Sequence, residues 1–213
     1  MKLMTMTQVT VDGVTQGNGG ASDEDRRNGF VRGGWALGVG DSETMTLINE
    51  TYERADAFLF GRRTYELVAG YWGAEERARP AAADPDNHPI TAALNARPKY
   101  VVSTTLTEAS WANTTVLSGD LAEAVGALKA KPDGELQVHG SGALIRSLLE
   151  HDLVDEMTLI IVPVVLGQGA RLFPEDGPDI ALDLVESRTD SKGVTVQVYR
   201  PDGRPQYPAA TAY

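Results

Sequence analysis

The sequence predicts an α/β fold with three layers, α-β-α, around a mixed, mainly parallel central sheet that ends in an antiparallel hairpin. Short, wholly apolar runs such as Ala57–Phe60 suit strands that are buried on both faces. These runs alternate with segments whose apolar residues recur at helical spacing. Strands that alternate with helices imply right-handed crossovers between parallel strands.

The first part of the chain predicts a strand, a long loop and a helix. Leu3–Val11 alternates apolar and polar residues, as a strand does, and Asp12-Gly13 ends it. The segment from Val14 to about Asp41 is rich in Gly, Asp and Arg, and a loop of that length tends to be functional. Ser42 is the expected helix cap. It precedes apolar residues at roughly helical spacing, namely Met45, Ile48, Tyr52 and Ala55.

The strand-and-helix unit then recurs to the end of the chain. After Ala57–Phe60, which Gly61 ends, the expected helices are Thr64–Ala69, Ile90–Ala96, Leu121–Lys129 and Gly142–Glu150. The expected strands are Lys99–Ser103, Glu135–His139 and Val154–Val162. Leu182–Arg188 and Val194–Arg200 flank Ser191-Lys192-Gly193 and predict an antiparallel hairpin.

Length and composition indicate one domain over residues 1–200 and a flexible C-terminal tail over 201–213, which contains Pro and Gly. The net charge of −11 argues against nucleic acid or an anionic membrane as a partner. The chain has no cysteine, which excludes disulfides and thiolate ligands, and its three histidines lack the spacing of a metal site. We find no apolar leader or membrane span, so we expect a cytoplasmic protein without a metal.

Three expected strands are followed by small, hydroxyl or basic residues. These segments are Gly61-Arg62-Arg63-Thr64, Ser103-Thr104-Thr105 and Gly140-Ser141-Gly142-Ala143. In an open α/β sheet, ligands bind beyond the carboxyl ends of the strands, and helix N-termini there attract phosphate. Together the segments predict a site for a molecule with several phosphates, such as a dinucleotide. Each alone has an ordinary alternative, since a glycine can simply make a turn and an arginine pair can be solvated, and no GxGxxG or GxxxxGK[ST] motif is present.

The chain from about Lys2 to Arg200 resembles the dihydrofolate-reductase-like proteins that share a domain with the reductase half of the bifunctional riboflavin-synthesis enzyme. It is similar to the stand-alone bacterial members, in which Gly33-Gly34-Trp35 and Tyr71-Trp72 are typical. The final Pro-Val-Val-Leu-Gly-x-Gly segment is the most specific part. The resemblance is carried by Asp12-Gly13-Val14, Gly61–Glu66, Val101–Thr104, Val138–Gly142 and Pro163–Gly169.

The resemblance implies an NADPH site. Gly61, Arg62, Arg63 and Thr64 would hold cofactor phosphates, and Ser103 and Thr104 would lie near the adenosine ribose and its 2′-phosphate. The turn after the third of these strands would pass under the pyrophosphate and nicotinamide ribose, through Gly140, Ser141, Gly142, Ala143 and Leu144. The segment Asp12–Gln16, which includes Val14, would border the nicotinamide.

Five further residues are candidates for the substrate site. Asp12, at the carboxyl end of the first strand, is the candidate catalytic acid. Gln16, Trp35, Tyr71 and Trp72 are candidate substrate contacts, because aromatic faces stack on flat heterocycles, although these aromatics could equally be packing anchors. A carboxylate equivalent to the pterin-binding acid of dihydrofolate reductases would come from the long loop, with Asp23, Glu24, Asp25 and Asp41 as candidates. His139 is expected in the core.

The resemblance, in agreement with the strand-end segments, implies an NADPH-dependent oxidoreductase that transfers a hydride to a C=N or C=O bond of a small pterin-like or pyrimidine-like heterocycle. Dihydrofolate reductase and 5-amino-6-(5-phosphoribosylamino)uracil reductase are the reference activities. The resemblance also implies a homodimer. The alternative is a non-catalytic NADPH-binding or regulatory module on the same fold.

Overall fold

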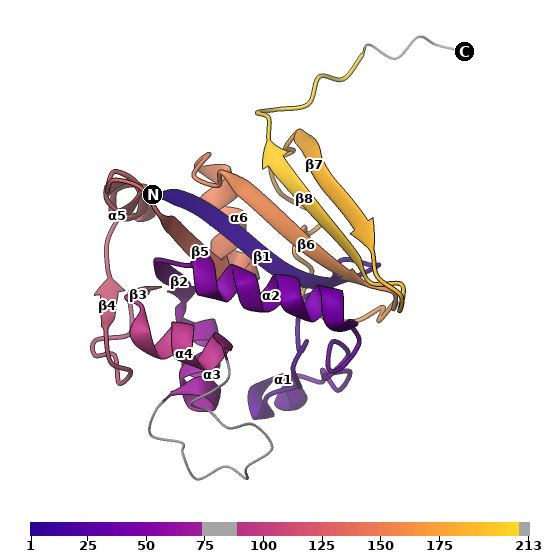
Figure 1. The fold of residues 1–213 in the computed structure, drawn as a ribbon, viewed down its shortest axis with the longest axis horizontal. Helices are drawn as coiled ribbons and strands as arrows, with labels where there is room; N and C mark the ends of the chain where they lie inside the picture. The colour runs from indigo at the N-terminus through magenta and orange to yellow at the C-terminus, as the bar shows by residue number, and fades with distance from the viewer. Residues whose placement is uncertain (74–88, 209–213) are drawn as a thin grey trace.

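A computed structural model of the protein describes residues 1–73 and 89–208. An eight-stranded sheet with the order β4-β3-β2-β5-β1-β6-β8-β7 forms its centre (Figure 1). The strands are β1 (Lys2–Thr10), β2 (Ala57–Gly61), β3 (Lys99–Val102), β4 (Thr114–Leu117), β5 (Glu135–His139), β6 (Glu156–Val162), β7 (Leu182–Thr189) and β8 (Thr195–Pro201). The helices are α1 (Asp23–Arg27), α2 (Ser42–Arg54), α3 (Arg62–Trp72), α4 (Pro89–Ala96), α5 (Leu121–Lys129) and α6 (Gly142–Glu150).

The pairing of the strands confirms the mixed, mainly parallel sheet. Strands β1 to β6 pair in parallel with one another, and β8 pairs antiparallel with both β6 and β7. The predicted C-terminal hairpin is therefore confirmed. It turns between Asp190 and Val194, where the Asp190 N–H donates to the Val194 carbonyl at 2.8 Å.

Strand β2 shows why the layers form. Its side chains alternate between two apolar clusters, with Leu59 in one and Phe58 and Phe60 in the other, and all three are fully buried or nearly so. The cluster around Leu59 includes residues of α5 and α6, and the cluster around the two phenylalanines includes residues of α2, α3 and α4. Each fully buried side chain of this size contributes about 1.5–3 kcal/mol of transfer free energy. The wholly apolar run therefore lies between helices on both faces, as predicted.

Four local predictions need correction. Asp41, not Ser42, caps α2, because its side chain accepts from the N–H groups of Glu43 (2.9 Å) and Thr44 (3.2 Å). Helix α3 begins at Arg62 and ends at Trp72, and so extends beyond the predicted 64–69 at both ends. The long loop contains the short helix α1. Strand β4 was not predicted, since it has only four residues, none of them buried, and is the outermost strand on its side of the sheet.

The C-terminal segment is partly tied to the domain. Pro201 belongs to β8, and the Asp202 N–H donates to the Ala181 carbonyl at 2.8 Å. Arg204 donates to the Asp179 carbonyl at 2.6 Å. Residues 209–213, which end the predicted tail, lie outside the described part of the chain. Residues 74–88 also lie outside it, and they include Pro80, Pro85 and one of the three histidines, His88. The flexibility of the tail stays a prediction.

Candidate functional site

The segments predicted to bind phosphate lie along one edge of the sheet. Strands β3, β2, β5 and β1 are parallel neighbours in that order, so their carboxyl ends meet at the same edge. The segments that follow these strands are Ser103-Thr104, Gly61–Thr64, Gly140–Leu144 and Asp12–Gln16. The strand order thus brings every residue predicted to bind the cofactor to one continuous edge.

The turns after β2 and β5 touch each other. The Gly61 N–H donates to the Ser141 hydroxyl oxygen at 3.0 Å. A Cβ at Gly61 would lie 3.5 Å from that oxygen, and a Cβ at Gly140 would lie 3.6 Å from the Thr64 methyl carbon. Gly140 and Ser141 both have left-handed backbones, with φ of 62° and 59°. For Ser141 this conformation costs about 1–2 kcal/mol, a strain that is common at functional sites.

Helices α3 and α6 begin at these turns without side-chain caps. Their N-cap residues, Gly61 and Ser141, make no capping hydrogen bond through a side chain. By contrast, side chains of Ser22, Asp41 and Asp120 cap α1, α2 and α5. The first N–H groups of a helix have no partner within the helix, and together with the helix dipole they attract anions. Two neighbouring helix N-termini therefore offer donors suited to phosphate or pyrophosphate.

Arg62 and Arg63 point toward different parts of this edge. The Arg62 guanidinium donates to the Thr105 hydroxyl at 2.6 Å, beside the segment after β3, and its Nε lies 3.1 Å from Glu66 Oε1. Arg63 forms an ion pair with Glu24 of α1. Both arginines are more than 40% exposed. They place fixed positive charge on both sides of the α3 N-terminus.

Ser103 and Thr104 differ in their freedom to meet a ligand. Ser103 is buried, and its hydroxyl accepts from the N–H groups of Thr105 (3.2 Å) and Leu106 (2.9 Å), which shapes the turn after β3. Thr104 is exposed. The geometry therefore gives Ser103 a supporting role in the turn and leaves the Thr104 hydroxyl on the surface.

Three hydrogen-bond donors hold the Asp12 carboxylate at the end of β1. Its carboxylate accepts from the Thr10 hydroxyl at 2.6 Å and from the N–H groups of Leu166 (3.1 Å) and Gly167 (2.8 Å). Arg171 adds a more distant charge at 4.0 Å. These hydrogen bonds, led by that from Thr10, lower the pKa of Asp12 to about 2. An ionised carboxylate of this kind suits the positioning of the 166–167 backbone better than it suits proton donation.

We expect Asp12 to make stability pH-dependent in acid. A folded pKa of about 2, below the ordinary 3.8, stabilises the fold at pH values above the unfolded pKa, and this stabilisation is lost as the pH falls from about 5 toward 2. Asp12→Asn should therefore be less stable than wild type in urea at pH 7, and the difference should shrink steadily as the pH falls from about 4 toward 2. An equal difference at pH 7 and at about pH 2 would contradict the assignment.

The segment after Asp12 connects the site to the long loop. Val14 is fully buried with Phe30 and Leu166, so its side chain packs beneath the edge. The Gln16 amide donates to Asp25 at 2.7 Å and accepts from the Ala170 N–H at 2.9 Å. The Trp35 indole donates to the Gln16 carbonyl at 2.8 Å. Gln16 and Trp35 thus lie together, and their role as substrate contacts stays a prediction.

Tyr71 and Trp72 lie at the other end of α3. Nine or ten residues at 1.5 Å each separate them from Arg62, which is about 15 Å along the helix axis. Their rings meet edge to face at 4.8 Å, and Trp72 packs against the apolar cluster that includes α4. The length of the helix therefore separates them from the turn at Gly61, and Trp72 has a packing role.

The candidate carboxylates of the long loop all have partners. Asp23 pairs with Arg26 at 2.7 Å, and Glu24 pairs with Arg63. Asp25 accepts from Ser22 and Gln16, and Asp41 caps α2 while it also accepts from Ser191 at 2.7 Å. His139 is buried and stacks on Tyr52 with ring centroids 4.2 Å apart. Burial lowers the pKa of His139 to about 3, in agreement with the predicted core position.

Some contacts of the site were not predicted. The partners Glu24, Thr105 and Arg171 are distant in sequence from the residues that they hold. One local signal was available, because Ser22 and Asp25 form a capping box and their spacing marks a helix start. Among the described residues, no group of three or more His, Asp or Glu could hold a metal ion. None of the described helices is long and apolar enough to cross a membrane.

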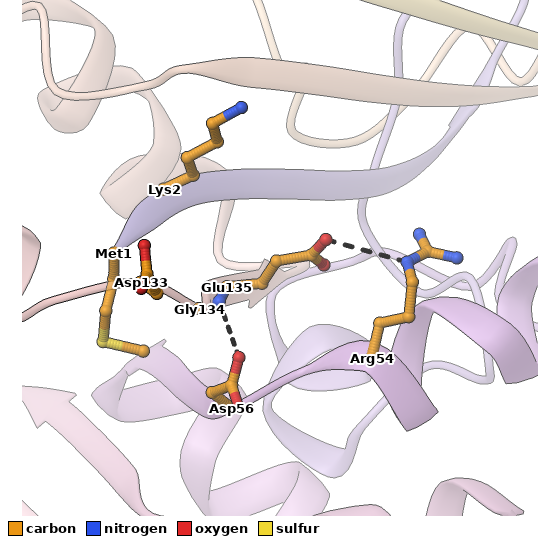
Figure 2. A pocket seen from close by; sticks show the side chains of 7 residues that line it. All are labelled: Met1, Lys2, Arg54, Asp56, Asp133, Gly134 and Glu135. Carbon is orange, nitrogen blue, oxygen red and sulfur yellow. Dashed lines mark hydrogen bonds and ion pairs between the residues drawn. The ribbon is translucent and has the colours of Figure 1, made fainter.

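A pocket of about 600 Å³ lies elsewhere, at the amino ends of the strands (Figure 2). One pair of its charged groups lies close together, since Arg54 is 3.7 Å from Glu135, and Asp56 accepts from the backbone N–H of Glu135 at 2.9 Å. This pocket has no helix N-terminus and no link to the predicted segments. The arrangement at the carboxyl ends of the strands is therefore the stronger candidate for a cofactor site.

Comparison with known proteins identifies relatives of this chain. The YyaP protein of Bacillus subtilis (strain 168), which is uncharacterized, is 32% identical over 197 residues that cover 92% of each chain. A crystal structure from Shewanella sp. PV-4, provisionally assigned to riboflavin biosynthesis, has a TM-score of 0.68 and 24% identity over 95% of this chain and 99% of that one. Dihydrofolate reductase from Enterococcus faecalis, complexed with NADP(H) and RAB-propyl, has a TM-score of 0.57 and 14% identity over 94% of this chain and 96% of that one.

These structural similarities confirm the dihydrofolate-reductase-like fold. The sequence itself matches the family model of the RibD C-terminal domain over residues 1–196, which is nearly the whole chain. The chain therefore belongs to the RibD C-terminal domain family.

Proposed function

We propose that the protein is an NADPH-dependent reductase that transfers a hydride to a small pterin-like or pyrimidine-like heterocycle. One observation carries the proposal: two neighbouring helices, α3 and α6, begin uncapped at the same sheet edge, with Arg62 and Arg63 beside them. This donor set fits a dinucleotide with several phosphates. Membership of a reductase family and the NADP(H) complex of the Enterococcus faecalis enzyme support the choice of cofactor.

Each part of the edge has a role in the proposal. Gly61–Thr64 binds cofactor phosphates, and Thr104, supported by Ser103, binds the adenosine ribose and its 2′-phosphate. Gly140–Leu144 lies under the pyrophosphate and nicotinamide ribose. NADPH, when bound, supplies the hydride, and the protein aligns the substrate and excludes water. Gln16 and Trp35 border the substrate, whereas Tyr71 and Trp72 are the more remote candidates.

Asp12 holds the loop at the nicotinamide side in this proposal. Because its pKa is about 2, the carboxyl carries no proton to donate near neutral pH. Solvent or the substrate itself then supplies the proton that follows hydride transfer. A pyrimidine-like heterocycle is one of the candidate substrates for this hydride transfer. In support, a pyrimidine reductase-like protein from Corynebacterium diphtheriae has a similar fold, with a TM-score of 0.60 and 15% identity over 94% of this chain and 92% of that one.

A non-catalytic NADPH-binding module is the second candidate. The engagement of Asp23, Glu24, Asp25 and Asp41 in structural contacts favours it, because none of these carboxylates is held in the protonated form that donates to a substrate. Titration calorimetry with NADPH and NADH, followed by NADPH oxidation with a panel of pterins, pyrimidines and quinones, separates the candidates. Micromolar NADPH binding with turnover supports the enzyme, and binding without turnover supports the module. If neither nucleotide binds, both candidates fail.

The proposal also includes a homodimer and a cytoplasmic location. Strand β7 is the outermost strand on its side of the sheet and exposes apolar side chains, with Leu184 55% and Val185 46% exposed. Exposed edge strands are surfaces on which a second chain can pair. Sedimentation at micromolar concentration tests the dimer directly.

A further inference from the structure

Helix α1 touches the candidate site at two separate points. Its Glu24 forms an ion pair with Arg63, at the turn after β2, and its Asp25 accepts from the Gln16 amide at 2.7 Å, on the segment after β1. In the proposed function, Arg63 meets cofactor phosphate and Gln16 borders the nicotinamide and substrate. Two consecutive residues of one helix therefore contact both halves of the proposed site.

The helix itself is held only by polar contacts. It has five residues, none of them buried, and a helix this short is unstable in isolation. The Ser22–Asp25 capping box and the contacts with Arg63 and Gln16 support it. The chain on either side is anchored, since Val14 and Phe30 are both buried in the cluster with Leu166. Segments with few buried apolar contacts open locally at low free-energy cost, so α1 can move while its ends stay in place.

Glu24 has the same charge as the expected ligand. Its hydrogen bond and ion pair with Arg63 hold the pKa of Glu24 below the usual range, so the side chain is anionic at neutral pH. Asp23 and Asp25 add two more carboxylates to the same helical turn. A cofactor phosphate at Arg63 would meet this charge within the Debye length of about 8–10 Å. Glu24 and the phosphate are thus alternative partners for one guanidinium.

We propose that α1 acts as a latch on the site: Glu24 pairs with Arg63 in the absence of cofactor, and a cofactor phosphate takes the place of the Glu24 carboxylate at the Arg63 guanidinium when NADPH binds. Because Asp25 is the next residue, the same displacement releases the Gln16 amide on the nicotinamide side. Binding of a cofactor phosphate at Arg63 thereby frees the Gln16 side chain beside the proposed substrate position, and α1 is the element that couples the two. This inference rests on the proposed function, since it assumes that Arg63 binds cofactor phosphate.

Calorimetric titration of two matched variants with NADPH tests the latch. Glu24→Gln should bind NADPH about twofold to fivefold more tightly than wild type, the range expected when an exposed competing ion pair is removed. Asp23→Asn removes the same charge from the same turn. Asp23 forms an ion pair with Arg26 and, among the described residues, none with Arg63, so the NADPH affinity of this variant should change by less than twofold. In an Arg63→Gln background, Glu24→Gln should have no effect. Equal affinities for wild type and Glu24→Gln would overturn the latch.

Hydrogen exchange of the amides of residues 22–30 gives a readout that does not depend on affinity. Exchange should be faster in Glu24→Gln than in wild type without nucleotide, and saturating NADPH should speed it in wild type. Unchanged exchange in both comparisons would overturn the latch even if NADPH binds. If wild type does not bind NADPH, the proposed function itself fails, which is a different result from NADPH binding that Glu24→Gln leaves unaltered.

Discussion

Arg62→Ala is expected to weaken NADPH binding by tenfold or more, which corresponds to about 1.4 kcal/mol. The guanidinium lies beside the N-terminus of α3 and donates to Thr105, so it can reach a phosphate between the turns after β2 and β3. Charge-assisted hydrogen bonds to phosphate are about twice as strong as neutral ones. Because Arg62 lies next to the segment proposed for the 2′-phosphate, the loss should be larger for NADPH than for NADH. Calorimetry with both nucleotides measures it.

The matched control is Arg54→Ala. Arg54 is also a partly exposed arginine in an ion pair, but it lies in the pocket at the opposite edge of the sheet (Figure 2). Its replacement should leave NADPH affinity within twofold of wild type. Thr104→Ala should weaken NADPH binding less than Arg62→Ala, since it removes a neutral donor. Equal losses in Arg54→Ala and Arg62→Ala would mean that the positive charge acts only through the net charge of the protein.

Leu148→Ala is expected to lower the free energy of unfolding by about 2–5 kcal/mol, as large-to-small substitutions in cores do. Leu148 is fully buried on α6, in the cluster that joins α5 and α6 to the sheet. The same helix begins at Ser141, so its packing also holds the turn that contacts Gly61. Urea unfolding monitored by circular dichroism measures the change.

Leu67→Ala provides the comparison for that substitution. Leu67 is 61% exposed on α3, and the same chemical change there should alter the free energy of unfolding by no more than about 0.5 kcal/mol. A Leu148→Ala loss below 1 kcal/mol would contradict the assignment of this side chain to the core. Addition of saturating NADPH should raise the stability of both variants if the proposed site is intact.

Local patterns in the sequence determined most of the secondary structure. The apolar run at Ala57–Phe60 predicted a strand buried on both faces, and its side chains do alternate between two clusters. The hairpin around Ser191–Gly193 and the turn at Gly140-Ser141 were also predicted, since each depends on a few adjacent residues. The glycine, hydroxyl and arginine residues at the strand ends indicated a phosphate site for the same reason. Short-range sterics and periodicity act within a few residues, so a single sequence carries them.

Only the tertiary structure decided which of these segments meet. The strand order places the turns after β3, β2, β5 and β1 side by side, although they lie far apart along the chain. The packing also buries Lys99 fully, with its ammonium group donating to the carbonyls of Leu94 and Arg97. It likewise brings the backbone N–H groups of Leu166 and Gly167 to the Asp12 carboxylate. The contacts of α1 with Arg63 and Gln16 also depend on the tertiary structure. Such pairings depend on how distant elements pack, and packing is set by the sum of many weak contacts across the whole core, which no local pattern contains.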